Sequence, residues 1–361
     1  MNDSSFGEEE LTPLEDLLPE HPPLWAGDSK TAVVRAVEAG VPSEGLGVFA
    51  RWWQLEDWLR LLLHIELRAS RGTTWAEALT SKGPNLAERD TENAYMSSPD
   101  STNLLAYLDA GELFDLLGSD DVWPLVEYAL LKRKRWDGLV DELRSIRNRI
   151  AHLRRPHRDD LARVEQALRN LEPGARSAME AFNRRHRVPA DPLDDLARAW
   201  VLGQHEDARR LLRHAEQQYD TAFQISYSLR PWALTSREST RRAGTMIHAS
   251  WYLRDGAAIR PRDFWSDDQL DSTGARELMV FVEHQSDAEV GVAFSGADDP
   301  AAIATAIGTC FDIVLRHRQR MPNAAARKRW LIDSVGLDWR VQVETALLLA
   351  TEDQPFSIFR A

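Results

Sequence analysis

One short stretch of the sequence carries side chains suited to cleaving RNA: Arg147, Asn148 and His152 lie within six residues of one another. An RNA strand supplies its own nucleophile, the 2′-hydroxyl, so cleavage requires a proton acceptor, a proton donor and a cation for the phosphate. Histidine can accept or donate a proton near neutral pH, and arginine offers a permanently charged, forked donor to phosphate. Asparagine can orient the imidazole or hold a phosphate oxygen. Together these residue types suit RNA cleavage without a metal ion.

The three residues lie on a stretch whose apolar side chains recur with helical spacing, which predicts a helix from 136 to about 154. With about 100° of rotation per residue, one arc of this helix is apolar and the opposite arc is polar, with Arg147 at the border. Asn148 and His152 stack one turn apart, whereas Arg147 lies about 140° around the axis from His152. A single copy therefore presents a spread pair, and an isologous homodimer is expected to gather two arginines and two histidines around one groove. The apolar arc comprises Leu139, Leu143, Ile146 and Ile150, and the polar arc Arg144, Asn148, Ala151, His152 and Arg155.

The surrounding sequence is more specific than this spacing. Arg209 and His214 repeat the spacing with Arg210 in place of asparagine, and we assign that second occurrence no chemistry. By contrast, the run Asp141–His152, DELRSIRNRIAH, resembles the signature helix of HEPN proteins, an all-helical family found in toxins, defence nucleases and CRISPR effectors. Residues 51–60, RWWQLEDWLR, are similar to the first long helix of one branch of that family.

The resemblance covers residues 44–172 and implies a dimeric helical bundle that cleaves RNA to leave a 2′,3′-cyclic phosphate, in a toxin or anti-phage defence system. It also implies that Arg147 and His152 are catalytic and that Asn148 supports them, with no metal and no cofactor. The sequence departs from the toxin branch at Arg154, where many members carry tyrosine. Some HEPN proteins are non-catalytic, so the alternative function is a scaffold or a ligand- or RNA-binding assembly subunit.

Charge is distributed unevenly along the chain. The net charge of −13 argues against general nucleic-acid affinity, but residues 132–158 contain ten basic and three acidic side chains. Such a local surplus suits phosphate binding, and a solvated charged face is the alternative. The run 132–135 is equally compatible with the C-terminal end of a helix, where cations are favoured. The cations predicted to contact RNA are Arg144, Arg149, Arg155, Lys132, Arg133, Lys134 and Arg135.

Residues 1–43 are predicted to form an acidic, proline-containing N-terminal arm. Residues 1–28 hold eight acidic and no basic side chains, and Leu24-Trp25 forms a short apolar insert. An anionic segment lying over the groove would compete with phosphate, so we expect the arm to restrain cleavage. A purely solubilising tail is the alternative.

The remaining sequence predicts a mixed fold, with an all-α HEPN-like bundle over 44–188 and an α+β domain with an antiparallel sheet over 189–361. In the bundle we expect a first long helix from Ser43 to a stop at Gly72, a helix over 121–134, a helix capped by Asp159-Asp160, and a break at Pro173-Gly174. The second domain is expected to sense a trigger, bind a protein partner or position substrate. Its predicted strands are 223–227, 246–253, 278–282 and 290–294, and its later helices 301–318, 324–332 and 341–350.

Composition limits the remaining possibilities. The single cysteine, Cys310, excludes an internal disulfide framework and a cysteine-rich zinc site and favours a reducing compartment. No stretch approaches the length of apolar sequence that a membrane span needs, so we expect a soluble cytoplasmic protein. His64 and Glu66, inside the first long helix, are expected to be polar side chains with partners inside the bundle. The acid-rich stretch around Asp263, Asp267 and Asp271 is more typical of a solvated loop than of a metal site.

Overall fold

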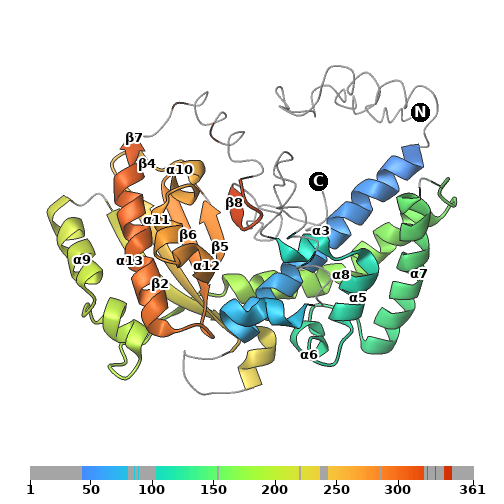
Figure 1. Ribbon diagram of the computed structural model, residues 1–361, viewed down its shortest axis with the longest axis horizontal. Helices are drawn as coiled ribbons and strands as arrows, with labels where there is room; N and C mark the ends of the chain where they lie inside the picture. The colour runs from blue at the N-terminus through green and yellow to red at the C-terminus, as the bar shows by residue number, and fades with distance from the viewer. Residues whose placement is uncertain are drawn as a thin grey trace, which may run out of the picture.

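The computed structural model describes residues 43–79, 103–152, 154–218, 221–235, 243–284, 286–320 and 337–343, with the isolated positions 85, 88, 323 and 330. A largely helical N-terminal half lies beside a C-terminal half that contains an antiparallel sheet (Figure 1). The chain therefore mixes α and β structure with helices first, as its periodicity predicts. None of the described helices is long and apolar enough to cross a membrane.

The helical half is built around α3 (Ser43–Arg71), which begins and ends where the sequence predicts. Gly72 follows with a φ of 56°, a left-handed conformation that suits glycine and ends the helix. The other elements pack around α3 into one apolar cluster. They are η1 (Gly72–Ala78), η2 (Leu104–Tyr107), α5 (Ala110–Leu117), α6 (Trp123–Val126), α7 (Arg133–Ala151) and α8 (Asp160–Asn183).

Two predictions in this half are wrong, and both concern segments that meet in one close backbone contact. In place of the helix expected over 121–134, the structure has the four-residue helix α6, followed by a turn. The break expected at Pro173-Gly174 is absent, and α8 continues through both residues. A Cβ on Gly174 would lie 1.9 Å from the carbonyl oxygen of Ala129. The turn after α6 is thus pressed against α8 at a point where only glycine fits, so tertiary packing overrides the local signals.

The second half contains a sheet in the order β1-β2-β3-β6-β5-β8, with every neighbouring pair antiparallel except β5 and β8. The four predicted strands are confirmed. The strands of this sheet are β1 (His186–Arg187), β2 (Thr221–Leu229), β3 (Thr245–Leu253), β5 (Met279–His284), β6 (Glu289–Ser295) and β8 (Val341–Val343). A small second sheet pairs β4 (Ala257–Ala258) with β7 (Gln319–Arg320).

Helices cover the sheet and join its strands. The prediction for 301–318 is confirmed by α13, whereas Val341–Val343 form strand β8 rather than the start of a helix. The edge of β5 explains this difference, because Val282 N–H donates to Arg340 O at 2.9 Å and continues the ladder. The remainder of 341–350 and nearly all of 324–332 lie outside the described residues. The helices are η3 (Ala197–Val201), α9 (Glu206–Gln218), η4 (Pro231–Thr235), α10 (Pro261–Trp265), α11 (Gln269–Ser272), α12 (Ala275–Leu278) and α13 (Pro300–His317).

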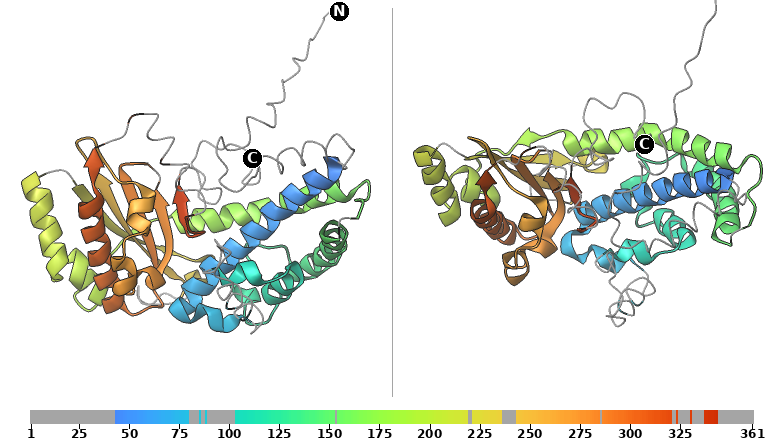
Figure 2. Two further views of the ribbon diagram at one scale, coloured as in Figure 1. Left: turned by 45° about the horizontal axis from the view of Figure 1, so that its top comes forward. Right: turned by 90° about the horizontal axis from the view of Figure 1, so that it is seen from above.

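The sheet is covered on both faces. On one face, Ile247, Ala249 and Trp251 pack in a cluster with α9 and α13. On the other face, Met246 and Phe281 belong to a cluster that includes apolar residues of α3 and Phe182 of α8. In Figure 2 both α3 and α8 extend from the helical bundle to the sheet. The two halves therefore share α3, which packs in both.

A buried ion pair also joins the halves. Glu66 of α3 and Arg230, which follows β2, are 0% and 1% exposed and form a salt bridge. The carboxylate of Glu66 also accepts from the Tyr128 hydroxyl at 2.5 Å and from Trp232 Nε1–H at 2.7 Å. The prediction that Glu66 is a partnered polar residue is confirmed. Nearby, His64 Nε2 lies 3.3 Å from Val280 O, and burial lowers the pKa of this histidine well below its usual value.

Candidate functional site

The predicted motif lies at the C-terminal end of α7. This helix ends at Ala151, three residues earlier than its periodicity predicts, and His152 is the C-cap, with φ −98° and ψ 17°. The N–H of Arg154 donates to the carbonyl oxygen of Arg149 at 2.9 Å and closes the last turn. Pro156 lies beyond this closure, so the helix ends through its own capping bond rather than at the proline. Asn148 therefore lies in the final turn, Arg147 lies just before it, and His152 begins the connection to α8.

Burial separates the motif from the core as the helical pattern predicts. The buried side chains of α7 are Trp136, Val140, Leu143 and Ile146. Asn148 and His152 are exposed and Arg147 is half-buried. None of these three side chains forms a hydrogen bond or ion pair with the described part of the chain. Their polar atoms are thus free to meet a ligand or a second copy.

Arg149, which is predicted to bind RNA, forms an ion pair with Asp160 at the end of α7. Its Nε donates to Asp160 Oδ2 at 2.8 Å, and its Nη2 bonds the other carboxylate oxygen. Asp160 is 1% exposed and also accepts from the backbone N–H of His157 at 2.9 Å. Burial raises the pKa of Asp160, but these hydrogen bonds outweigh burial, so the net shift is downward. The predicted capping role also changes, because Asp160 lies inside α8 and the N-cap Asp159 makes no side-chain cap bond.

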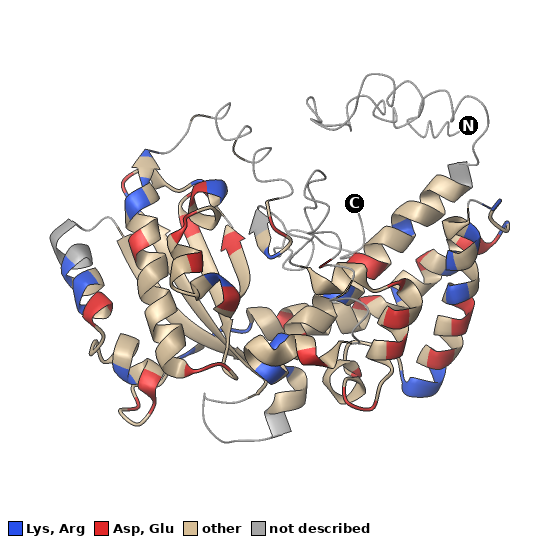
Figure 3. Cartoon of the chain, viewed as in Figure 1, with Lys and Arg blue, Asp and Glu red and all other residues tan. Residues whose placement is uncertain are grey.

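Most of the other predicted RNA-binding cations lie elsewhere. Arg144 forms an ion pair with Asp115 of α5. The run 132–135 lies at the N-terminal start of α7, so its interpretation as a C-terminal helix end is wrong. At about 1.5 Å per residue, this run lies about 26 Å or more from His152. Within it, Arg133 donates to Gly118 O at 2.6 Å, forms an ion pair with Asp137 and stacks over Trp123. In Figure 3, basic residues colour both ends of the α7 ribbon, with acidic residues between them.

The turn between α7 and α8 carries the free positive charge. Arg155, which the sequence assigns to RNA binding, is exposed there. Arg154 and Arg158 are exposed beside it, and none of the three has a side-chain partner among the described residues. Sequence reasoning did not assign Arg154 and Arg158 to the site. Their position in the connection directly after the motif is the signal that could have found them.

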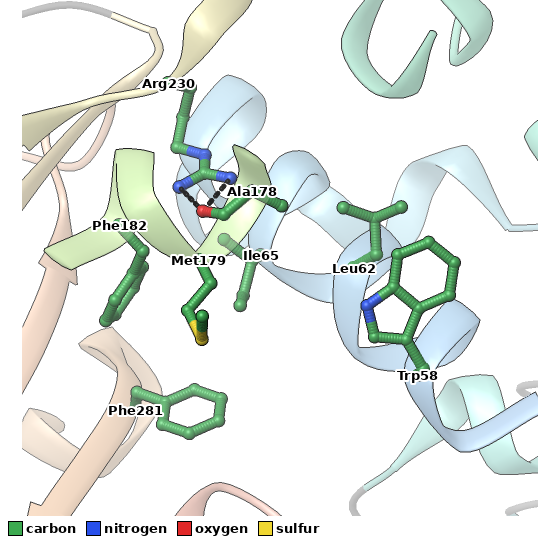
Figure 4. Close-up of a pocket in the computed structure, with 8 residues that line it drawn as sticks. All are labelled: Trp58, Leu62, Ile65, Ala178, Met179, Phe182, Arg230 and Phe281. Carbon is green, nitrogen blue, oxygen red and sulfur yellow. Dashed lines mark hydrogen bonds between the residues drawn. The ribbon is translucent and has the colours of Figure 1, made fainter. Parts of the chain in front are cut away.

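Two cavities among the described residues lie away from the motif, and no motif residue lines either of them. One, of about 20 Å³, lies at the joint between the halves, where Arg230 bonds the carbonyl oxygen of Ala178 (Figure 4). The other, of about 400 Å³, is bordered by α5 and η1, and its charged lining is mainly acidic, which opposes phosphate binding. The smaller cavity is lined by Trp58, Leu62, Ile65, Ala178, Met179, Phe182, Arg230 and Phe281. The acidic residues of the larger are Glu77, Glu112, Asp115 and Asp121, with Arg71 as its one base.

The described residues contain no group of three or more His, Cys, Asp or Glu side chains that could hold a metal ion. The acid-rich stretch of the second half binds cations of its own chain instead. Asp267 accepts from Arg316 and from His317, both at 2.7 Å. Asp263 and Asp271 form ion pairs with Arg260 and Arg276.

Comparison of this chain with protein-family models, with curated proteins and with solved structures finds no match.

Proposed function

We propose that this protein is a metal-independent endoribonuclease of HEPN type that works as a homodimer in a toxin or anti-phage defence system. The proposal rests on one observation, which is that the side chains of the motif have no partner among the described residues. Arg147, Asn148 and His152 gather at the end of α7 with no side-chain partner in the described chain, and a turn rich in unpaired arginines follows directly. Structural residues of these types would be expected to have partners, as the neighbouring Arg149 does.

The proposed reaction forms one bond and breaks one bond at phosphorus. The 2′-oxygen attacks the phosphorus, and His152 of one copy accepts the 2′-hydroxyl proton. The bond to the 5′-oxygen breaks, and that oxygen takes the proton back from the same imidazole. The products carry a 2′,3′-cyclic phosphate and a 5′-hydroxyl. An acid–base histidine contributes about 10²–10⁴-fold, and a donor to the charged phosphorane about 10²–10³-fold.

Arg147 and the turn have separate roles in this proposal. The forked guanidinium of Arg147 binds the phosphate that reacts, while Asn148 orients the imidazole or holds a phosphate oxygen. The exposed Arg154, Arg155 and Arg158 bind flanking phosphates, which position the strand without reading its sequence. The RNA-binding surface that we propose is therefore smaller than the set of cations predicted from the sequence, and it comprises the end of α7 and the turn that follows.

A second copy is part of the proposal because one copy presents an open surface. The motif lies outside both of the cavities described above, and Asn148 and His152 are exposed. Two copies related by a twofold axis would face each other with Arg147 and His152 from both sides. The second half, fixed to the bundle through α3, would bind a trigger or partner, and nothing further is proposed for it.

The mechanism is tested with a single-cleavage RNA oligonucleotide in the presence of EDTA. We expect cleavage to continue under chelation, with 2′,3′-cyclic phosphate and 5′-hydroxyl ends, and to stop when the scissile nucleotide carries 2′-deoxyribose. A protein that loses activity in EDTA, or that cuts the 2′-deoxy substrate, does not use this mechanism. A protein that forms the dimer and binds RNA but never cuts it would be the non-catalytic scaffold.

A further inference from the structure

An apolar stripe is exposed on the first turns of α3. Leu46, Phe49 and Trp53 are 49%, 58% and 55% exposed. Their spacing of three and four residues places them on one face of the helix, and the exposed Ala50 lies on the same face. The opposite face, with Val48 and Trp52, is buried in the bundle. Three large apolar side chains in a row form the kind of surface that another polypeptide covers.

This stripe adjoins the turn that carries the free arginines. A Cβ on Gly45 would lie 3.9 Å from Pro156, and a Cβ on Gly47 would lie 3.4 Å from Leu161. Arg51 also reaches Glu165 of α8, at 3.9 Å. In Figure 2 the start of α3 lies beside the connection between α7 and α8. The apolar stripe and the basic turn are therefore neighbouring parts of one surface at this end of the molecule.

We propose that residues 1–42 of the same chain dock on this surface, with Leu24-Trp25 on the stripe and the acidic residues over the basic turn. Charge complementarity supports the assignment, because residues 1–42 contain nine acidic and two basic side chains, opposite in sign to Arg154, Arg155 and Arg158. Their apolar pair matches the apolar part of the surface. Residues 1–42 therefore match this surface in both charge and apolar content.

Chain connectivity also favours this occupant over a separate molecule. Residue 42 immediately precedes α3, and Trp25 lies 21 residues before Leu46. A chain of that many residues can span about 25 Å, which is enough to fold back over the first turns of a helix. Tethering gives such a segment an effective concentration on the order of millimolar. A weak apolar and electrostatic contact is therefore sufficient for occupancy.

Docking gives the segment a regulatory effect that rests on the proposed nuclease function. An anionic segment over Arg155 and its neighbours competes with the phosphates of RNA, so a docked arm lowers cleavage until RNA or another partner displaces it. The docking itself does not depend on catalysis and can be measured without RNA.

Cross-linking in the full-length chain tests the docking directly. Ala26→Cys is combined with Ala50→Cys, which leaves Trp25 and Phe49 in place, and a short bis-maleimide is added. The native Cys310 is fully buried, so it does not compete. The matched control is the same cysteine pair with Leu24→Ser and Trp25→Ser, which keeps the length of the tether and removes the apolar contact. We expect an intrachain link, at monomer mass, that forms at least fivefold faster with Leu24 and Trp25 in place. Equal rates with and without the two apolar side chains, or a link at dimer mass, would overturn the proposal, and the latter assigns the stripe to a second copy.

A charge variant tests the regulatory consequence. Full-length protein carrying Glu8→Gln, Glu9→Gln and Glu10→Gln should cleave RNA several times faster than wild type at low salt, with the difference shrinking as salt screens the contact. Equal cleavage rates for this variant and wild type at every salt concentration would show that the arm does not restrain cleavage. If no variant cleaves RNA but the Ala50 cross-link still forms, the nuclease proposal fails while the docking stands.

Discussion

Arg149 and Asp160 form a two-bonded ion pair across the turn between α7 and α8. Arg149 lies in the last turn of α7 and Asp160 in the first turn of α8, so the pair closes the loop that carries His152 and the exposed arginines. The backbone N–H of His157 adds a third bond to the same carboxylate. The site is thus held at its base by a buried carboxylate while its reactive side chains stay exposed.

Replacing Asp160→Asn should loosen this loop. The amide cannot pair with the Arg149 guanidinium as a carboxylate does, and we expect a loss of about 1–3 kcal/mol in the free energy of unfolding, with slower RNA cleavage. Asp159→Asn is the matched control, since Asp159 is exposed and makes no cap bond, and it should change stability by less than about 0.5 kcal/mol. Urea unfolding curves measure both free energies of unfolding. Equal losses for the two variants would show that the ion pair has no structural role.

The same pair predicts a pH dependence. Because the folded pKa of Asp160 is lowered, its contribution to stability is present above the pKa of the unfolded carboxyl and is lost as the pH falls through the folded value. The stability difference between wild type and Asp160→Asn should therefore shrink in acid. A difference that stays constant from pH 7 down to pH 2 would contradict the pairing.

The buried ion pair at the joint predicts a large effect from one substitution. Arg230→Met leaves Glu66 buried without its counter-charge, which should cost about 3–5 kcal/mol in the free energy of unfolding. Adding Glu66→Gln to Arg230→Met should restore part of this loss, because it removes the uncompensated charge. Arg209→Met, at an exposed arginine of α9, serves as the control. Equal unfolding midpoints for Arg230→Met and Arg209→Met would show that the joint does not depend on the pair.

His284 should make the fold sensitive to acid. It is 3% exposed on β5, neither ring nitrogen has a partner among the described residues, and burial lowers its pKa to about 3. Folding therefore disfavours the protonated form of His284. As the pH falls below the unfolded pKa, the unfolded chain takes up a proton that the folded chain does not, and the free energy of unfolding falls by about 2 kcal/mol between pH 7 and pH 5. His284→Phe should reduce the acid sensitivity by that amount, and His186→Phe, at an exposed histidine, should not. Parallel stability curves for His284→Phe and wild type would refute the assignment.

A shared site predicts complementation between inactive variants. Arg147→Ala and His152→Ala should each lack activity alone, but mixed dimers retain one intact arginine and one intact histidine at the composite groove. Refolding or co-expressing the two variants together should recover part of the wild-type rate, whereas mixing either variant with itself recovers none. Absence of any recovery, with mixed dimers shown by mass, would place the whole site within one copy. Arg147→Lys should keep partial activity, because a point charge lacks the fork.

The sequence predicted the elements that have strong internal periodicity. The alternation around Met246–Leu253 located β3, the spacing of Phe49, Trp52 and Leu55 located α3, and the apolar arc of α7 placed Asn148 and His152 outside the core. These features depend on residues near one another in the chain. The same periodicity could not show that Phe49 stays exposed while Trp52 is buried, because that depends on which side chains of other helices, such as Phe114 of α5, pack against each of them.

The features that sequence reasoning missed depend on contacts between distant residues. Gly174 fits against Ala129 only in three dimensions, so Pro173-Gly174 looked like a helix break. Val341–Val343 form a strand because β5 offers them an open edge. The sequence gives no reason to treat Arg149 and Arg147 differently. Only the position of Asp160 in the structure shows that Arg149 is paired and Arg147 is not. Charge alone could therefore not distinguish Arg144 and Arg149, which have carboxylate partners, from the unpaired arginines.

The central claim is that His152 performs RNA cleavage, and one comparison tests it most directly. Purified wild type, His152→Ala and His186→Ala are incubated with total RNA in EDTA, after circular dichroism and sizing have shown that all three have the same fold and oligomeric state. Because His152 is exposed beyond the end of α7, its loss should abolish cleavage by at least about 10²-fold and leave the fold intact. Wild type and His186→Ala should cut at equal rates. Cleavage by His152→Ala at the wild-type rate, or no cleavage by wild type, would contradict the account.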